Sequence, residues 1–197
     1  MRKKPYHHGD LRNALVHEGL RLLEQDGPEA VSLRAVARAA GVSEAAPYSH
    51  FSGKHKLMAA IAAKGFRMLS DALEPVATDS SRSIVDLGMS YIRFAEHHPY
   101  LYTLMFETNE AHVADDDELQ RAGREALNLL SLKAGLPNNE PLEDIGSLAA
   151  WSLVHGLVML LIKGRVKAGD RNLVAGVLAI LKPGIDERRS SDNEGGC

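Results

Sequence analysis

Apolar side chains recur every three or four residues along most of the chain, and alternating runs of β-branched residues are absent. The clearest stripe consists of Leu33, Val36, Ala37 and Ala40, whose spacing places all four on one face of an amphipathic helix. Similar stripes recur as far as the polar C-terminal end. The pattern therefore predicts an all-α fold.

Capping residues and helix breakers divide these stripes into separate helices. Asp10, Ser32 and Ser43 are expected N-caps, because their side-chain oxygens can accept hydrogen bonds from the amides of a first turn. The expected helices span about 10–26, 32–40, 43–51, 54–73, 83–97, 100–106, from the acidic loop ending at 117 to 133, 142–167 and 172–181. Residues 74–82 are expected to form a loop, and residues 184–197 a disordered polar tail.

Residues 32–51 read SLRAVARAAGVSEAAPYSHF and predict two short helices joined by a tight turn at Gly41. Glycine permits the backbone conformation of such a turn, and Val42 would fill the angle between the helices. This is the plan of a helix-turn-helix, whose second helix lies in the major groove of DNA. An ordinary corner between two packed helices uses the same turn chemistry, so the spacing alone leaves both interpretations open.

Charge is distributed unevenly along the chain. Residues 1–67 carry 11 Lys and Arg against 6 Asp and Glu, a net charge of +5, whereas residues 68–197 carry a net charge of −8. A basic N-terminal third suits a polyanionic partner, although chance clustering on a solvated surface would give the same count. Donors for phosphate and base edges gather around the predicted turn: Arg34, Arg38, Tyr48, His50, Lys54 and Lys56. Their concentration favours DNA binding, although Arg38 is better explained as a solvated or salt-bridged surface residue.

Other classes of protein find less support. The apolar run 145–162 contains Ser147, Ser152, His155 and two glycines, which favours a buried helix of a soluble protein over a membrane span. The basic N-terminus has no apolar stretch behind it and the only cysteine is Cys197, so a cytoplasmic protein without disulfides is expected. Catalytic motifs, metal-ligand spacing and cofactor fingerprints are absent from the sequence, which predicts a non-enzyme that needs no metal or cofactor.

Residues 41–54 read GVSEAAPYSHFSGK and are followed by Leu57. This stretch resembles the DNA-binding domain of TetR-type repressors, whose pattern is roughly G-V-S-x-x-x-x-Y-x-H-F-x-x-K-x-x-L, and it matches without a gap. YHHGDLR at 6–12 and WSLVHG at 151–156 resemble the subgroup that carries a Trp…His-Gly signature in the C-terminal domain. Pro47 stands where many relatives have a bulky aliphatic residue, which implies a short, stiff recognition helix and leaves its docking angle open.

The resemblance implies a domain organisation and a set of DNA contacts. Residues 9–55 would form a three-helix DNA-binding domain, and a long fourth helix would join it to a helical effector-binding and dimerisation domain in residues 56–183. Phosphate contacts would come from Ser43, Tyr48, His50 and Lys54. Base edges would be read by Arg34, Glu44 and Ala45, with a small contribution from Ser49.

One short recognition helix touches too few bases, so a homodimer on a pseudo-palindromic operator is expected. The last two long helices, around 145–161 and 172–180, would form the dimer interface, because their apolar residues wrap more than one face. Small residues in both helices would permit close approach.

A pocket for a small-molecule effector is expected among the middle helices, although most of its residues suit a plain hydrophobic core equally well. The candidate lining residues are Met89, Phe94, Tyr102, Met105, Phe106, Trp151, His155 and Met159. An effector that binds the DNA-incompetent state more tightly would release the operator. The sequence thus predicts a ligand-responsive repressor, with a transcriptional activator or a helical adaptor that never touches DNA as alternatives.

Overall fold

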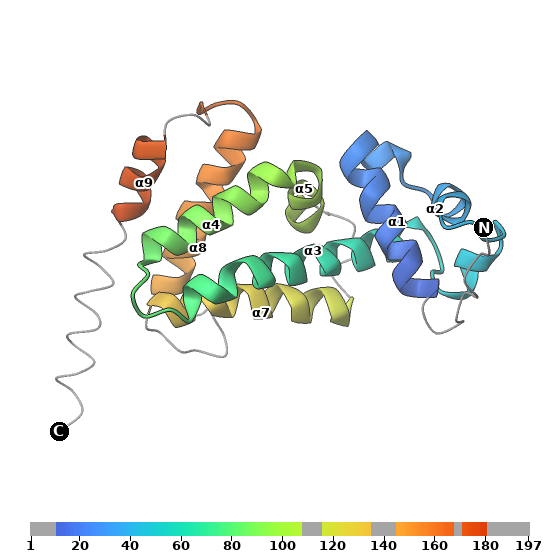
Figure 1. Ribbon diagram of the computed structural model, residues 1–197, viewed down its shortest axis with the longest axis horizontal. Helices are drawn as coiled ribbons and strands as arrows, with labels where there is room; N and C mark the ends of the chain where they lie inside the picture. The colour runs from blue at the N-terminus through green and yellow to red at the C-terminus, as the bar shows by residue number, and fades with distance from the viewer. Residues whose placement is uncertain (1–10, 108–115, 135–144, 168–170, 181–197) are drawn as a thin grey trace, which may run out of the picture. The chain divides into compact units, whose positions relative to one another are not determined.

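The computed structural model describes residues 11–107, 116–134, 145–167 and 171–180. In chain order its helices are α1 (Leu11–Asp26), the 3₁₀ helix η1 (Pro28–Ala30), α2 (Leu33–Ala39), the 3₁₀ helix η2 (Ala46–Ser49), α3 (Lys54–Ala77), α4 (Ile84–His97), α5 (Pro99–Glu107), α7 (Asp117–Ala134), α8 (Ile145–Ile162) and α9 (Arg171–Ala179) (Figure 1). Within the described ranges no strand is present. The predicted all-α fold is confirmed.

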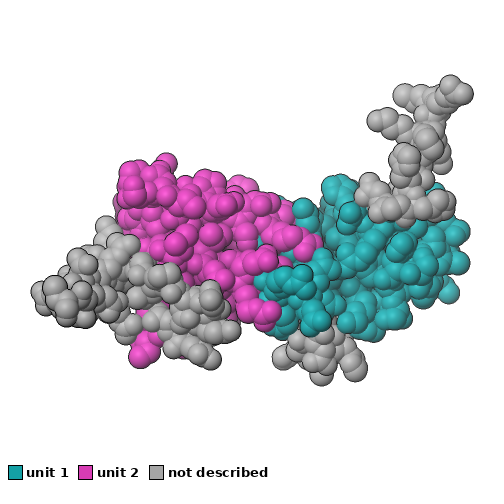
Figure 2. All heavy atoms as spheres, turned by 90° about the horizontal axis from the view of Figure 1, so that it is seen from below, with its two compact units in different colours: residues 1–66, 98–121 teal, residues 67–97, 122–197 magenta. Residues whose placement is uncertain are grey.

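The chain forms two compact units, which Figure 2 shows in different colours. Unit 1 comprises residues 1–66 and 98–121, and unit 2 comprises residues 67–97 and 122–197. Two of the three boundaries along the chain fall inside helices, α3 and α7, and the third falls between α4 and α5.

In unit 1, α1 packs against α2 and α5 around a core of fully buried aliphatic side chains that includes Leu15, Leu23 and Val36. Gly19 lies where α1 meets α3. A Cβ atom at this glycine would stand 2.7 Å from Cδ1 of Ile61, which is closer than real contacts allow. The missing side chain therefore permits the close crossing that places the helices of this unit.

In unit 2, α4 is the central helix and packs against both α8 and α9. Leu87 and Tyr91 of α4 are almost fully buried, as is Val154 of α8. Gly88 faces α9 so closely that an added Cβ would lie 2.8 Å from Cδ1 of Leu178. Burial of these apolar faces is the main force that holds the unit together.

Helix α8 is apolar on all sides, with a mean hydropathy of 2.0 over its 18 residues. By length and composition it could cross a membrane, but a single helix of this kind is weak evidence, because core helices of soluble proteins meet the same criteria. Only 33% of these residues are buried within the chain. Three of its large apolar side chains, Ile145, Leu148 and Leu160, are exposed.

Two helix ends differ from the prediction. The predicted end of the long helix at Leu73 is wrong, because α3 continues to Ala77 with Pro75 inside its last turns. So close to the end, the missing proline amide removes only one hydrogen bond. The predicted end of α8 at about residue 167 is also wrong. Gly164 adopts a positive φ of 67° and the Arg165 amide bonds back to the Leu160 carbonyl at 2.8 Å, a geometry that terminates the helix after Ile162.

The cap predicted at Ser32 is confirmed, since its hydroxyl accepts a hydrogen bond from the Ala35 amide at 3.1 Å. Ser83 and Asp86 cap α4 reciprocally: the Ser83 amide donates to the Asp86 carboxylate at 2.7 Å, and the Asp86 amide donates back to the Ser83 hydroxyl. The bonds from the Ser83 amide and hydroxyl lower the pKa of Asp86 below its ordinary value. The expected N-cap Asp10 and the tail 184–197 lie outside the described residues.

Candidate nucleic-acid interface

The recognition segment, residues 43–51, follows a turn whose geometry depends on glycine. Gly41 has a φ of 70°, and its amide bonds to the Arg38 carbonyl at 3.2 Å while the Val42 amide reaches the Ala37 carbonyl at 3.0 Å. These bonds close the C-terminal end of α2 and redirect the chain. The turn predicted at Gly41 is confirmed.

The recognition segment is shorter and tighter than the predicted helix over residues 43–51. Only Ala46–Ser49 are helical, and they form the 3₁₀ helix η2. In an α-helix the amide of residue 47 would bond to the Ser43 carbonyl, but Pro47 has no amide. The Ala46 amide takes this carbonyl instead, at 3.0 Å, and so sets the tighter three-residue spacing.

The predicted capping role of Ser43 is wrong. The N-cap position of η2 is occupied by Ala45, and no side chain caps the helix. The Ser49 hydroxyl donates to the Ala46 carbonyl at 2.8 Å, so it bonds within its own turn. The Ser43 side chain is exposed to solvent.

Exposed donors and buried anchors alternate along the recognition segment. Pro47 is buried and Phe51 is only 2% exposed, which fixes the segment to unit 1. Tyr48, between them, is 55% exposed. All eight residues that the sequence nominates for DNA contacts are exposed: Arg34, Ser43, Glu44, Ala45, Tyr48, Ser49, His50 and Lys54. Their arrangement on one short stretch and the start of α2 and α3 is compatible with simultaneous contact to a duplex.

Two of these side chains have partners that the sequence did not indicate. The Arg34 guanidinium lies 3.7 Å from the Glu44 carboxylate, and both side chains are well exposed. Lys54 donates from Nζ to the Pro28 carbonyl at 3.1 Å, which joins the start of α3 to η1. Both contacts are at the surface, where such interactions are weak enough to exchange for others.

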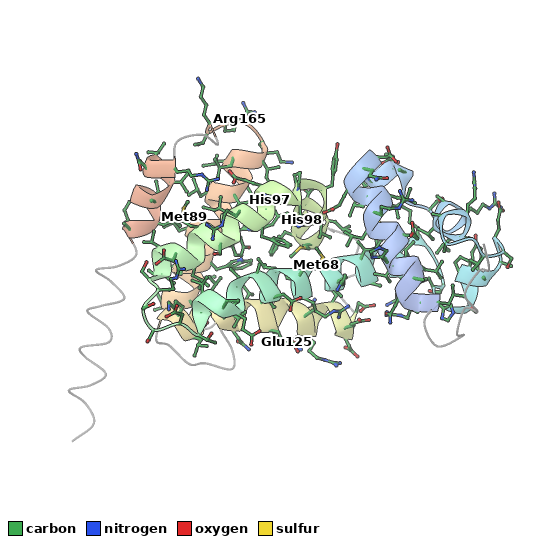
Figure 3. The ribbon with its side chains drawn as sticks, in the orientation of Figure 1. Met68, Met89, His97, His98, Glu125 and Arg165 are labelled. Atoms are coloured by element: carbon green, nitrogen blue, oxygen red, sulfur yellow. The ribbon has the colours of Figure 1, made fainter. Side chains whose placement is uncertain are left out.

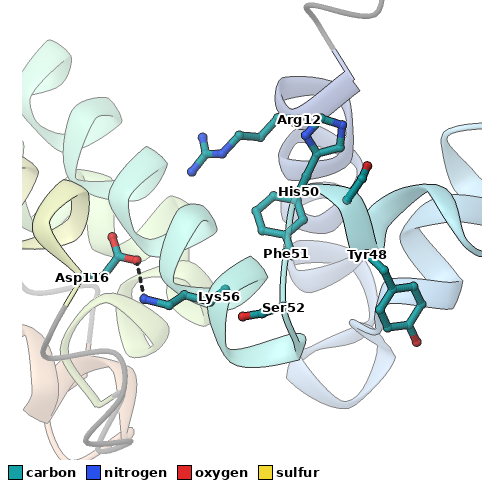
Figure 4. A pocket seen from close by; sticks show the side chains of 8 residues that line it. Arg12, Tyr48, His50, Phe51, Ser52, Lys56 and Asp116 are labelled. Atoms are coloured by element: carbon teal, nitrogen blue, oxygen red, sulfur yellow. Dashed lines mark hydrogen bonds and ion pairs between the residues drawn. The ribbon is translucent and has the colours of Figure 1, made fainter.

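Next to the recognition segment lies a pocket of about 470 Å³ (Figure 4). Its lining residues are Arg12, Tyr48, Ser49, His50, Phe51, Ser52, Lys56 and Asp116. Sequence reasoning did not assign Arg12 to any site and named Lys56 only as a member of the basic cluster. Both cations are paired with the start of α7: Arg12 lies 2.7 Å from Glu118, and Lys56 lies 3.2 Å from Asp116.

The candidate effector residues separate into two groups. Tyr102, Met105 and Phe106 belong to unit 1, where the Phe106 ring packs edge-on against Phe66 with ring centroids 5.1 Å apart. The others belong to unit 2, in which the rings of Trp151 and His155 lie with their centroids 5.6 Å apart and are tilted by 45°. Phe94, Tyr102 and Met105 are buried, whereas Met89, Phe106, Trp151, His155 and Met159 are half-buried.

Two histidines at the junction of α4 and α5 make local contacts. At the end of α4 (Figure 3), His97 donates from Nδ1 to the Arg93 carbonyl at 2.7 Å, and the following His98 pairs with Glu24. Among the residues that the structure describes, no three His, Cys, Asp or Glu side chains form a group suited to a metal ion.

Comparison with known proteins relates both ends of the chain to one group of regulators. Residues 15–61 match the family model for bacterial regulatory proteins of the tetR family, and residues 84–179 match the tetracyclin repressor-like C-terminal domain. No curated protein matches the sequence.

Solved structures share the fold over most of the chain. A protein of unknown function from Rhodococcus sp. RHA1 is 28% identical, with a TM-score of 0.70 over 93% of this chain and 97% of its own. A tetR-family transcriptional regulator from Streptomyces coelicolor is 18% identical, with a TM-score of 0.70 over 97% and 87%. The multidrug binding protein EbrR, solved with imidazole, is 18% identical, with a TM-score of 0.61 over 90% and 96%.

Proposed function

Because the chain belongs to the tetR family of DNA-binding transcriptional regulators, we propose that it is a repressor that binds a pseudo-palindromic operator as a homodimer and releases it when a small-molecule effector binds. The observation that carries the proposal is the recognition segment, in which Pro47 and Phe51 are anchored while hydrogen-bond donors between and beside them face solvent. Such a segment presents donors to DNA without losing its own packing.

Within this proposal the exposed side chains divide into two roles. Tyr48, His50, Lys54 and the Ser43 hydroxyl hold backbone phosphates and so fix the register on the duplex. Arg34, Glu44 and Ala45 face base edges, where an arginine fits guanine and a carboxylate accepts from cytosine. Ser49 contributes little, since its hydroxyl is already used within η2.

The dimer interface proposed here is the exposed apolar surface of α8 and α9. Ile145, Leu148 and Leu160 of α8 are 71%, 41% and 46% exposed, and Leu173 of α9 is 52% exposed, with Ile180 just beyond it at 72%. A helix as apolar as α8 does not leave such a surface in water without cost. Pairing of α8 and α9 with the same helices of a second copy would cover it in a four-helix interface.

A charge in this surface tests the dimer. Leu173→Glu should shift the protein from dimer to monomer in sedimentation velocity, because the introduced carboxylate would lose its water in the interface. Leu132→Glu is the matched control, since Leu132 is an equally exposed leucine (48%) on α7, outside the proposed interface. Equal sedimentation of both variants and the unmodified protein would refute this interface.

The effector site is proposed in the C-terminal domain, among the half-buried aromatic and sulfur-containing side chains of unit 2 such as Met89, Trp151 and Met159. A multidrug binding protein with this fold offers a precedent for small-molecule binding, though only at the level of the fold. The WSLVHG motif at 151–156 is the basis for placing the chain in the Trp…His-Gly subgroup. We further propose that the protein acts in the cytoplasm, that it is not an enzyme, and that residues 9–55 and 56–183 are its two functional domains.

The decisive experiment compares DNA from upstream of the protein's own gene with scrambled DNA of the same length, at several salt concentrations. Sequence-dependent binding that weakens steeply with salt supports the proposal and yields the operator. Repression of a reporter that carries this operator, and relief by a compound from a ligand screen, then tests the regulatory part. No binding to either DNA at low salt would refute the proposal.

A further inference from the structure

The pocket beside the recognition segment places two cations next to groups that suit phosphate. Arg12 from α1 and Lys56 from α3 line it together with the hydroxyl-bearing Ser52 and with His50. The Arg12 guanidinium stacks over the Phe51 ring, 5.6 Å from its centroid, so its position is fixed by a buried aromatic side chain. We infer that Arg12 and Lys56 of this pocket bind backbone phosphates of DNA, and that carboxylates at the start of α7 compete with those phosphates for the two cations.

The carboxylates come from the acidic turn, which we define as Asp116 and Glu118 at the start of α7. Asp116 uses both oxygens: Oδ1 accepts from the Leu119 amide at 3.3 Å and caps α7, while Oδ2 holds Lys56. Glu118 holds Arg12. Figure 4 shows Lys56 extended toward Asp116, with Arg12 and Phe51 also at the pocket. The structure therefore presents the pocket with its positive charge neutralised.

These ion pairs are weak enough for DNA to replace. The side chains of Lys56 and Asp116 are 36% and 19% exposed, and those of Arg12 and Glu118 are 41% and 35% exposed. Partly hydrated pairs of this kind contribute little net stability. A DNA phosphate that approaches Tyr48 and His50 meets two carboxylates as long as the pairs persist, and two free cations once they open. The acidic turn thus lowers the affinity for DNA and hides two phosphate contacts.

The proposal rests on the DNA-binding function but is tested separately from it, with a duplex of scrambled sequence as the probe. The test variant is Asp116→Asn combined with Glu118→Gln, which removes both pairs while asparagine retains a good N-cap for α7. The matched control is Asp117→Asn combined with Glu125→Gln. Both of these carboxylates are exposed on α7 and no ion pair of the pocket involves them, so the control removes the same net charge.

The test variant should bind the duplex about fivefold to tenfold more tightly than the control at low salt, because about two further phosphate contacts become available. A plot of log K against log salt should become steeper by about 0.9 for each freed cation, or about 1.8 for each bound subunit. Adding Lys56→Gln to the test variant should return roughly half of that increase in slope.

Three results would overturn the proposal. In the first, the test and control variants have the same affinity and the same salt slope. In the second, the test variant binds DNA more weakly, which would mean that the ion pairs order the DNA-binding unit. In the third, the test variant gains affinity for inorganic phosphate while its DNA affinity equals that of the control. Phosphate binding is measured as a thermal shift at constant ionic strength. The pocket would then bind a free anion and not the DNA backbone. Failure of the unmodified protein to bind any DNA would instead contradict the proposed function.

Discussion

The hydroxyl of Tyr48 offers a sharp test of the recognition segment, because a single oxygen can be removed without changing the packing. In Tyr48→Phe the ring stays and only the donor is lost. The side chain is 55% exposed and lies on η2, whose buried anchor is the neighbouring Pro47. The substitution should therefore leave the melting temperature unchanged.

The expected loss of DNA affinity follows from the type of bond. A hydrogen bond from a neutral donor to a charged phosphate contributes about 1.5–3 kcal/mol. The lower end applies here, since the exposed hydroxyl of Tyr48 is hydrated before binding and exchanges water for phosphate. A loss of about 1.5 kcal/mol in binding free energy raises the dissociation constant roughly tenfold for each recognition segment.

The salt dependence separates this role from a charge effect. A neutral hydroxyl releases no counterions, so Tyr48→Phe should lower affinity without changing the salt slope, whereas Lys54→Gln should reduce the slope by about 0.9 for each bound subunit. Fluorescence anisotropy with a labelled duplex over a salt series measures both quantities. Tyr100→Phe is the matched control, because Tyr100 is an equally exposed tyrosine (49%) of the same unit that lies beside Gly27, on α5 rather than in the recognition segment. If the two phenylalanine variants bind DNA equally well, Tyr48 holds no phosphate and the proposed contact is wrong.

Three further substitutions test the fold that supports the site. Gly41→Ala should lower the free energy of unfolding by about 1–2 kcal/mol, as measured by urea denaturation. The cost is backbone strain alone, because φ is 70° while an added Cβ meets nothing within 4 Å. Gly41→Asn should cost less, since asparagine tolerates this backbone conformation better. Leu57→Ala should cost about 2–5 kcal/mol, since the side chain is fully buried; a loss below about 1 kcal/mol would contradict that burial. Asp86→Asn should cost about 1 kcal/mol at neutral pH through the weakened cap with Ser83. The pKa of Asp86 in the folded protein lies below its ordinary value of 3.8, so the stabilisation is present above pH 3.8 and is lost as the pH falls through the folded pKa. The difference in stability between the variant and the parent should therefore vanish in acid. A difference that stays constant with pH would refute the role of the carboxylate.

Local chemistry explains which parts of the fold the sequence could predict. The cap at Ser32 and the turn at Gly41 depend on bonds between residues a few positions apart, so the residue types alone suffice. The start of α3 at Lys54 follows equally local signals. The end of α3 at Ala77 does not follow from local signals. A proline near a helix end costs one hydrogen bond, and packing of the last turn decides whether the helix continues.

The pocket beside the recognition segment could not be predicted from the sequence. Its ion pairs join residues that lie 106 and 60 positions apart, Arg12 with Glu118 and Lys56 with Asp116. Charged side chains carry no periodic signal that would indicate which distant partner they meet. The acidic run before α7 and the basic N-terminal third were both visible, but only the folded chain brings them together.

The 3₁₀ geometry of η2 also changes where sequence readout must come from. Helix η2 has only four residues. Pro47 is buried and the Ser49 hydroxyl is bonded within the turn, so η2 cannot present several side chains to successive base pairs. Two long, exposed side chains outside this turn are Arg34 on α2 and Glu44 before η2, which lie 3.7 Å apart. A surface pair of this kind is worth about 1 kcal/mol or less, so either partner can leave the other for a base edge at little cost. A bidentate contact from Arg34 to guanine would exceed that cost, at about 1–3 kcal/mol, and would leave the Glu44 carboxylate free to accept from a cytosine amine. Base specificity in this protein is therefore expected to depend on α2 and the residues that precede η2, with η2 itself acting mainly to seat Tyr48 and His50 on the DNA backbone.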